Sequence, residues 1–502
     1  MTKNYDITII GGGVIGCAIA RELSKYNFNI ILIEKEADVA EGISKANSGV
    51  IHAGFNINPG TLKAKLNNQG VFMLPKLADE LGVEYNICKK LVVAKNDEEK
   101  IYLENLFERG KKNNTPGLSI VDGKTIKNLE PNVNGKWALY SENTGIITPY
   151  LLTIALAENA LKNGAKILLN TEVNSIVRNP DKTFHLKSNN TTICSSKCII
   201  NCAGLYSDKI ANLAATMRRH DGSSLQKNNQ QPIPRIYPCR GEYYILDKNA
   251  KNTINMAIYP VPPQHAKGLG VHLTPTMNGN ILIGPSADYI NERNDVANTK
   301  QVMDILKKEA FELMPSIKQY SFIKNFSGIR PKLFNADAGE SFADFHIAES
   351  ETTPNFINLI GIESPGLTSA SAIAKYVVEN IIGNKEDLIS NKAFDGSWEP
   401  IPRTADLGFD EIKKLIEKDP DYGELICRCE QITKKEVLLA LNNPLGVKTL
   451  NGIKKRTHSM MGRCQGGFCL SRISKILSNE FNLKPNEIVK SSKTSNYYFP
   501  NQ

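Results

Sequence analysis

The chain has 502 residues, 41% of them hydrophobic, which is enough for two or three domains with sizeable cores. No stretch approaches the ~18–20 consecutive apolar residues of a transmembrane helix, and no basic stripe with interleaved aromatic residues points to nucleic acid as a partner. The net charge of +9 comes mostly from lysine and fits either a solvated surface or the attraction of an anionic substrate or an acidic electron partner.

The N-terminus and the cysteine content together indicate the cellular compartment. The chain runs from Met1 almost directly into a predicted strand, which leaves no room for a signal peptide. Ten cysteines in so long a chain therefore indicate a reduced compartment rather than a disulfide framework. We expect a cytoplasmic protein, either free or peripheral to the inner face of the membrane.

The first predicted elements form a nucleotide-binding unit. An apolar strand over residues 6–10 enters a glycine turn at 11–16, and a helix is expected from Cys17 to about Lys25. A second apolar strand over 30–33 ends at an acidic residue, Glu34. This order of strand, glycine turn, helix, strand and acid within ~30 residues predicts dinucleotide binding.

Each residue of this fingerprint has a distinct physical task. Gly11 permits the tight turn, Gly13 lets the backbone approach a pyrophosphate, and Gly16 allows the helix to pack closely on the strand. The positive N-terminus of the helix would face the phosphates. Glu34 stands where a carboxylate would bind the ribose hydroxyls.

Elements far along the chain indicate that the dinucleotide is FAD rather than NAD. We expect a helix over 150–162, a strand over 165–169 that continues to 171–173, and strands over 198–202 and 356–360. A helix should begin near Leu367. A nucleotide fold assembled from segments some 300 residues apart, with long insertions between them, is typical of large flavoproteins. The last helix would direct its positive end at the flavin and stabilise negative charge on it.

Four cysteines near the C-terminus form two close pairs. They are Cys427 and Cys429, then Cys464 and Cys469, the last two in a glycine-rich turn. Four thiolates in this pattern suit a tetrahedral zinc site or a [2Fe–2S] cluster, and the flavin context favours iron because zinc has no redox chemistry.

The segments around these cysteines are expected to be short and helical. We expect a tether over 386–421 that wraps the flavin domain, helices over 434–441 and 470–477, and a loosely held tail over 481–502. The basic run Lys454–Arg456 fits a solvated surface or a docking point for an acidic partner.

Three motifs carry a resemblance to a known family. They are Asn47–Gly54 (NSGVIHAG), Gly328–Lys332 (GIRPK) and Gly361–Thr368 (GIESPGLT). Together they resemble the FAD-dependent D-amino-acid-oxidase-like superfamily, in the branch of type 2 glycerol-3-phosphate oxidases and L-2-hydroxyglutarate oxidases. The resemblance covers about residues 5–385. Residues 422–480 resemble the bacterioferritin-associated-ferredoxin-like [2Fe–2S] domain, which also ends the large subunit of the anaerobic glycerol-3-phosphate dehydrogenase.

The resemblance implies a combined α/β and α+β architecture. A Rossmann-like FAD-binding domain would be built from about residues 1–75, 145–215 and 325–385. An antiparallel-sheet substrate domain, about 76–144 and 216–324, would be inserted into it. A small helical domain with the four cysteines would follow at 422–480.

The chemistry of a secondary alcohol next to an anionic arm selects the substrate-site candidates. His52 is the expected base, because a neutral imidazole accepts a proton near pH 7 and the resembled oxidases use the histidine of this motif. His272 is the alternative base, whereas His265, His346 and His458 are expected to be solvent-facing or packing residues. The guanidinium of Arg330 suits a phosphate or carboxylate.

Further contacts are expected from loops and turns. Lys267 would add a second cation, and Ser48 and Ser364 would supply hydroxyl groups. The remaining FAD contacts are expected from Ser48, Val173, Ala203, Gly204, Gly366, Leu367 and Thr368.

The sequence thus predicts FAD-dependent oxidation of sn-glycerol 3-phosphate to dihydroxyacetone phosphate. Electrons would pass through a [2Fe–2S] centre to a protein partner or a quinone-linked chain, in an oligomer or a larger complex. Oxidation of L-2-hydroxyglutarate is the enzymatic alternative, because the two anions differ only at one end. An electron-transfer subunit and a zinc-stabilised scaffold with oxygen as the flavin acceptor are the others.

Overall fold

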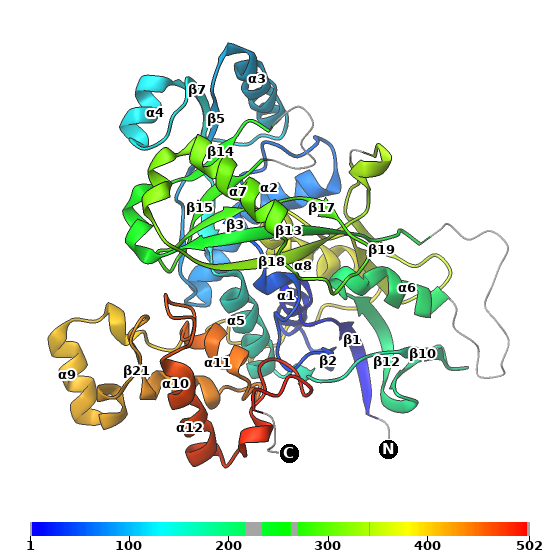
Figure 1. Cartoon of the computed structure of the whole chain (residues 1–502). Coiled ribbons are helices and arrows are strands. Elements are labelled where there is room, and N and C mark those ends of the chain that lie inside the picture. Colours follow the sequence, from blue (N-terminus) through cyan, green and yellow to red (C-terminus); the bar gives the residue numbers. More distant parts are fainter. Residues whose placement is uncertain (1–2, 216–232, 263–269, 341, 499–502) are drawn as a thin grey trace.

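The computed structural model describes residues 3–215, 233–262, 270–340 and 342–498. Two large sheets and a small C-terminal helical segment make up the molecule, and the helical segment lies at the lower left of Figure 1, beside the first sheet. The predicted fold class is confirmed. None of the helices in this described part of the chain has the length and hydropathy needed to span a bilayer.

The first sheet is the nucleotide-binding sheet. Its parallel centre runs in the order β20, β12, β1, β2 and β9. The strands of this sheet are β1 (Asn4–Ile10), β2 (Ile30–Ile33), β9 (Lys166–Leu168), β10 (Ser175–Arg178), β11 (Phe184–Ser188), β12 (Thr191–Asn201), β19 (His346–Glu349) and β20 (Phe356–Ile360). β2 and β20 are buried along their whole length and β1 is buried from Ile7 to Ile10, as parallel strands covered on both faces usually are.

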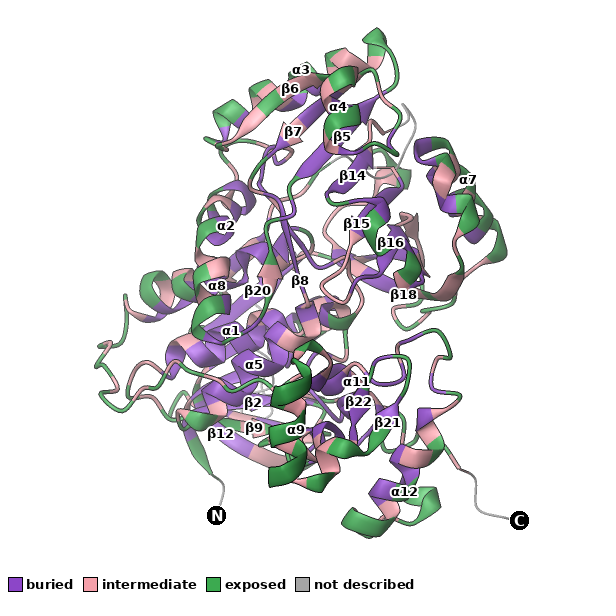
Figure 2. Cartoon of the chain, turned by 90° about the vertical axis from the view of Figure 1, so that its left-hand side faces the viewer, coloured by how far each residue is buried: buried purple, intermediate pink, exposed green. Residues whose placement is uncertain are grey.

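Three helices pack together on this sheet and form the main core. They are α1 (Val14–Leu23), α5 (Pro149–Lys162) and α8 (Gly366–Tyr376), which come from the start, middle and end of the flavin region. Figure 2 shows the buried α1, α5 and β2 side by side. Two sequence predictions need correction here. The first helix begins at Val14 rather than Cys17, and residues 171–173 are not a strand, because Thr171 turns back to donate its amide hydrogen to the carbonyl of Glu34.

The second sheet is largely antiparallel and carries the substrate side of the molecule. Its strands are β5 (Lys90–Ala94), β6 (Leu118–Asp122), β7 (Trp137–Ser141), β13 (Tyr237–Leu246), β14 (Ala257–Pro260), β15 (His272–Pro275), β16 (Ile281–Gly284), β17 (Asp288–Tyr289) and β18 (Phe322–Lys332). The sequence places the return to the flavin domain near residue 325. This position falls inside β18, which pairs with β13 up to the Tyr237–Lys332 pair.

Smaller elements connect or cover the two sheets. A three-stranded sheet lies at the junction, and α3, α4 and α7 cover parts of the second sheet. These elements are β3 (Val50–Ile51), β4 (Tyr85–Asn86), β8 (Gly145–Ile147), α2 (Leu62–Glu80), α3 (Asp97–Lys112), α4 (Gly123–Leu129), α6 (Ser207–Ala215) and α7 (Lys300–Leu313).

The C-terminal segment has its own apolar core. It contains β21 (Leu425–Cys427), β22 (Ile432–Thr433), α10 (Lys434–Leu441), α11 (Leu450–Thr457) and α12 (Cys469–Phe481). The tail was predicted to be loosely held. It is packed instead, because Ile488 is only 1% exposed in this core and the carbonyl groups of Val489 and Lys490 accept hydrogen bonds from the start of α11.

The segment between the flavin region and β21 runs along the first sheet. Asn159 of α5 donates hydrogen bonds to the carbonyls of Asp395 and Ser397, and the Trp398 indole donates to the Glu158 carboxylate at 2.9 Å. The exposed helix α9 (Phe409–Lys418) ends this segment and has no buried residue. Its exposed surface is visible in Figure 2.

Candidate functional site

The glycine turn between β1 and α1 has the backbone that its sequence requires. Gly11 has φ +111°, and a Cβ there would lie 2.5 Å from the carbonyl oxygen of Cys202. A Cβ at Gly16 would lie 2.0 Å from the Gly11 oxygen, so this helix can approach the turn only with glycine. A Cβ at Gly13 would meet only the Ser44 hydroxyl, at 3.3 Å, which leaves the turn open toward the cavity.

Two side chains close the nucleotide end of the site. Glu34 at the end of β2 accepts hydrogen bonds from the Gly12 amide at 2.6 Å and the Glu36 amide at 2.9 Å, while burial raises the pKa of its carboxyl. Ser44 was not predicted from the sequence. Its hydroxyl accepts a hydrogen bond from the Val14 amide at 2.9 Å, where α1 begins.

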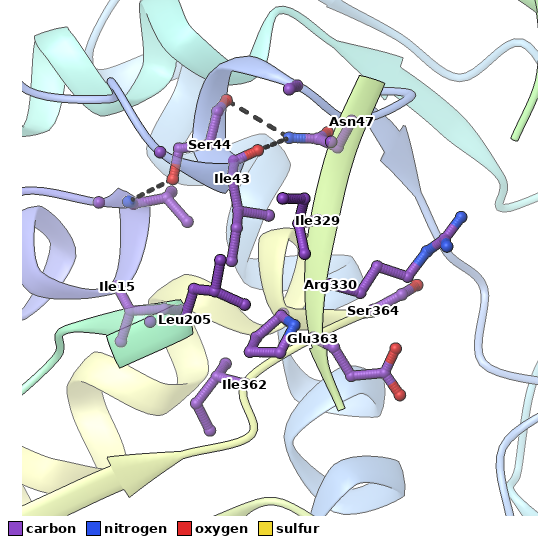
Figure 3. Close-up of a pocket in the computed structure, with 18 of the residues that line it drawn as sticks. Ile15, Ile43, Ser44, Asn47, Leu205, Ile329, Arg330, Ile362, Glu363 and Ser364 are labelled. Atoms are coloured by element: carbon purple, nitrogen blue, oxygen red, sulfur yellow. Dashed lines mark hydrogen bonds between the residues drawn. The ribbon is translucent and has the colours of Figure 1, made fainter. Parts of the chain in front are cut away.

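A single cavity of about 1150 Å³ joins the glycine turn to the predicted substrate residues. This volume exceeds the usual 300–1,000 Å³ of small-molecule sites, so a dinucleotide and a small substrate fit the same space. Figure 3 shows Ser44 and Asn47 on one side of it and Arg330, Glu363 and Ser364 on another. Twelve predicted residues line it: Gly11, Gly13, Glu34, Ser48, His52, Val173, Ala203, Gly204, Arg330, Ser364, Gly366 and Leu367.

Three predicted residues are absent from this lining. Gly16 is packed against Gly11, and Thr368 is buried behind the cavity, where its hydroxyl accepts a hydrogen bond from the His52 amide at 2.9 Å. Lys267, like His265, lies outside the described residues. The first two residues therefore shape the backbone of the site rather than its surface.

The His52 imidazole faces the cavity, and elements from both ends of the chain fix its position. Its Nε2 lies 3.3 Å from the Ser364 hydroxyl, and its carbonyl accepts a hydrogen bond from the Asn67 side chain at 3.2 Å. Burial, and next the nearby Lys90 ammonium, lower the pKa of His52 to about 3. The imidazole is therefore neutral at pH 7 and able to accept a proton.

Lys90 is a residue that sequence reasoning missed. It lies on β5 at 3% exposure, and its ammonium sits 3.9 Å from the centre of the Tyr259 ring. Burial lowers the pKa of this ammonium to about 7. The alternative base, His272, also lines the cavity. Its ring stacks on that of Tyr259, with the two ring centroids 3.4 Å apart.

The guanidinium of Arg330 is held without a direct carboxylate partner in the described part of the chain. It donates to the Ser286 carbonyl at 3.0 Å and contacts the Cys239 sulfur at 3.7 Å. Gly241 on the neighbouring strand leaves room for it, because a Cβ there would lie 2.6 Å from the guanidinium. Its positive charge is therefore available to an anion in the cavity.

A buried ion triad beside Arg330 was also missed. Glu363 contacts Lys63 at 3.2 Å and Lys332 at 3.5 Å, and these two ammonium groups, despite burial, keep the pKa of Glu363 below its usual value. The only sequence signal was the placement of Glu363 directly before Ser364 in the third motif. This triad adds net positive charge near the predicted anion site.

The adjacent residues Tyr243 and Tyr244 of β13 lie in different environments, and Ser48 contacts the first of them. The Ser48 hydroxyl lies 3.3 Å from the Tyr243 hydroxyl, and the Tyr243 ring stacks on Phe326 with centroids 4.7 Å apart. Tyr243 lines the cavity, whereas Tyr244 packs against Phe322 in the core of the second sheet. Tyr243 therefore forms part of the pocket wall, and Tyr244 is structural.

The four C-terminal cysteines pair across the two loops rather than within them. The neighbouring Cys469 side chain lowers the pKa of Cys427, whereas the pKa of Cys464 is lowered, despite burial, first by the Phe468 backbone and then by the Cys429 side chain. Among the residues that the structure describes, no group of three or more His, Cys, Asp or Glu side chains is arranged so that it could hold a metal ion. Four thiolates supply the ligands of a [2Fe–2S] cluster, which takes two cysteines per iron.

The C-terminal segment docks on the flavin sheet through residues that were predicted to be solvated. Arg456 of α11 is 3% exposed and contacts Asp38 at 2.8 Å and Glu158 at 3.2 Å. Lys455 is also buried and contacts Asp38 at 3.0 Å and Glu41 at 2.8 Å. These two cations therefore bind acidic residues of the same chain.

A second set of ion pairs ties the cysteine loops to the substrate sheet. Glu430, directly after Cys429, contacts Lys248 at 2.6 Å and accepts a hydrogen bond from His458 at 3.0 Å. Arg463, directly before Cys464, donates to Asp247 at 2.6 Å. His458 is thus a buried polar contact beside the cysteines.

Comparisons with known proteins agree with both parts of this site. Residues 6–380 match the family model described as FAD dependent oxidoreductase (DAO), and residues 425–479 match the BFD-like [2Fe-2S] binding domain. Both resemblances inferred from the sequence are confirmed. The predicted cofactors, FAD and a [2Fe–2S] cluster, are confirmed with them.

Individual relatives cover different parts of the chain. A glycerol 3-phosphate dehydrogenase of Caloramator mitchellensis is 40% identical over 98% of this chain and 97% of its own length. An L-2-hydroxyglutarate dehydrogenase of Nematostella vectensis is 31% identical over 75% of this chain and 90% of its own. The FAD-bound L-alpha-glycerophosphate oxidase of Mycoplasma pneumoniae has a TM-score of 0.70 and 32% identity, covering 79% of this chain and 98% of that one.

Proposed function

Because the chain belongs to the FAD dependent oxidoreductase family, we propose that it oxidises sn-glycerol 3-phosphate to dihydroxyacetone phosphate. The observation that carries this proposal is the similarity to a glycerol 3-phosphate dehydrogenase over 98% of the chain, which includes the cysteine segment as well as the flavin region. The structurally similar glycerophosphate oxidase supports the same substrate for the flavin region alone.

The residues in the cavity divide the work of this oxidation. Neutral His52 takes the hydroxyl proton of the substrate, and the neighbouring Ser364 hydroxyl, 3.3 Å away, orients the alcohol. Arg330 binds the phosphate, with Lys267 proposed as a second cation. Gly11, Gly13 and Glu34 would hold FAD along the glycine turn, and FAD, when bound, would supply the hydride acceptor for this oxidation.

Oxidation of L-2-hydroxyglutarate is the second candidate, because relatives with that activity share 31–35% identity with the flavin region. Mixing the enzyme with each compound in the absence of oxygen, while following flavin absorbance, separates the two. We expect glycerol 3-phosphate to bleach the flavin within turnover times and L-2-hydroxyglutarate to do so far more slowly. The reverse order would contradict the proposed substrate, and no bleaching by either would favour an electron-transfer subunit.

We also propose that Cys427, Cys429, Cys464 and Cys469 bind the [2Fe–2S] cluster. This cluster, when bound, would supply one-electron transfer toward a partner protein or a quinone-linked chain. Oxygen can react with reduced flavin directly, so a chain that used oxygen as its acceptor would need no cluster. Cys464→Ser should remove the cluster signal from the circular dichroism spectrum and slow delivery of electrons to an external acceptor, while substrate still bleaches the flavin. Zinc without iron in anaerobically purified protein would refute the relay.

A further inference from the structure

The four cysteines differ in their exposure to solvent. Cys427 is 2% exposed and Cys469 is fully buried, and both belong to the apolar core of the C-terminal segment. Cys429 and Cys464 are exposed. A cluster held by these four thiolates therefore has an inner side in the protein core and an outer edge at the molecular surface.

Two arginines and an aromatic ring stand beside this outer edge. Arg428 and Arg472 lie over the Phe468 ring, with their guanidinium carbons 4.2 Å and 4.7 Å from the ring centre. Arg472 also donates to the carbonyl of Leu425 at 3.1 Å, and the Leu425 side chain is 40% exposed. We call these four residues, Leu425, Arg428, Phe468 and Arg472, the acceptor face.

The positive charge of the acceptor face is not neutralised within the described chain. Neither Arg428 nor Arg472 forms an ion pair with a carboxylate there, whereas the third nearby arginine, Arg463, is occupied by Asp247. Residues 422–480 contain ten lysines and arginines but only four acidic residues. Two of these four, Glu430 and Glu436, are buried in internal hydrogen bonds.

We propose that the acceptor face is the docking site of an electron-carrier protein with an acidic surface. This inference rests on the proposed relay function and identifies the chemistry of its partner. Arginine and aromatic residues are the types enriched at the centres of protein interfaces. Unpaired surface charge also accelerates the encounter with a partner of opposite charge.

The electron count fits a one-electron protein carrier. Oxidation of one secondary alcohol to a ketone removes two electrons and two protons. One proton leaves from the hydroxyl group, and the other leaves together with both electrons as the hydride. A [2Fe–2S] centre passes these electrons one at a time, so two oxidised carriers are each reduced by one electron for every substrate oxidised.

The composition of the adjoining surface favours a protein over a lipid bilayer. The exposed helix α9, which packs near Leu425 through the turn at Gly423, has three acidic and three lysine side chains and so no net charge. A helix that binds an anionic bilayer presents a polar face rich in lysine and arginine. We therefore assign this side of the molecule to a protein partner.

Stopped-flow reoxidation of the substrate-reduced holoenzyme tests the assignment. The protein probes are cytochrome b5, whose surface is acidic, and cytochrome c, whose surface is basic; both accept one electron. We expect the wild type to reduce cytochrome b5 faster than cytochrome c at low salt. Arg472→Glu combined with Arg428→Glu should lower the cytochrome b5 rate by about 10-fold or more and abolish its dependence on ionic strength.

Controls separate a docking effect from damage to the cluster. Lys448→Glu reverses one charge, as each of the two arginine substitutions does, but beside Phe481 at the far end of α12, about 18 Å along the helix from Cys469, and should leave the cytochrome b5 rate unchanged. The cluster signal in circular dichroism and the rate of flavin reduction by substrate should also persist in the double variant.

Two results would overturn the assignment. One is an unchanged cytochrome b5 rate in the double variant with an intact cluster. The other is sedimentation of the wild type, but not the double variant, with phosphatidylglycerol vesicles, which would assign the face to a lipid surface. Failure of the relay itself is recognised separately, because the cluster signal would then not respond to substrate even in the wild type.

Discussion

Replacing Arg456 with leucine should release the C-terminal segment from the flavin sheet. The guanidinium is 3% exposed and bridges two acidic side chains, Asp38 at 0% and Glu158 at 7% exposure. Removing one partner of a buried ion pair costs about 3–5 kcal/mol, because the remaining charge stays buried. Lys455 still contacts Asp38 at 3.0 Å, and burial already raises the pKa of Glu158 toward protonation. We therefore expect the lower end, about 3 kcal/mol.

The assay follows the two parts of the molecule separately during heating. Flavin fluorescence reports the flavin region, and visible circular dichroism of the cluster reports the C-terminal segment. If that segment behaves as a unit of about 60 residues, 3 kcal/mol lowers its transition by on the order of 10–20 °C. The cluster signal should then be lost well before flavin is released, whereas the wild type should lose both together.

Matched variants test the electrostatic reasoning. Arg456→Lys keeps the charge but loses the two-sided geometry, so its transition should fall between those of wild type and Arg456→Leu. Lys475→Leu removes an exposed cation from α12 and should change little. Coincident transitions at the wild-type temperature in Arg456→Leu would refute the claim that this network holds the segment in place.

The remaining predictions concern the cavity. His52→Ala should retain FAD but slow flavin reduction by roughly 10²–10⁴-fold, as measured in single-turnover stopped flow; a near-normal rate would transfer the role of base to His272. Because the pKa of His52 is lowered to about 3, wild-type flavin reduction should show no loss from protonation of this imidazole as the pH falls from 8 to 5. Lys90→Met should move that loss only slightly upward in pH, because burial, which is the larger cause of the lowered pKa, remains in the variant. Lys90→Met should also stabilise the fold near pH 7. The pKa of Lys90 is about 7 in the folded state and higher in the unfolded state, so the wild type gains stability as the pH rises from 7 toward 10. A denaturant midpoint that does not increase in the variant at pH 7 would contradict this. Arg330→Leu should weaken substrate binding by about 2–5 kcal/mol with the flavin still reducible, and unchanged saturation behaviour would show that the arginine is structural.

The sequence was most informative where short-range chemistry dictates the backbone. The glycine turn, the NSGVIHAG motif and the GIESPGLT motif each specify local geometry, and the structure brings His52 and Ser364 within 3.3 Å although 312 residues separate them. Two local predictions were wrong because tertiary contacts replaced the expected strand or solvent. Thr171 donates a hydrogen bond to the carbonyl of Glu34, directly after β2, and Ile488 in the tail completes an apolar core.

The residues that sequence reasoning missed act through partners distant in the chain. Lys90 is an ordinary strand residue until Tyr259 and His52 are placed beside it, and Lys63 gains meaning only through Glu363, 300 positions away. Arg456 shows the same limit in reverse. By composition alone, the run of three basic residues that includes Arg456 indicates solvent exposure. Only the fold shows that acidic side chains contact it.

The C-terminal segment contacts both sheets, through Arg456 on one side and through Asp247 and Lys248 on the other. The segment therefore links the two sheets to each other. Asp247 directly follows β13, the strand that also carries Tyr243 of the pocket wall. A rotation of the substrate sheet relative to the flavin sheet would therefore have to carry the cysteine loops with it or break these ion pairs.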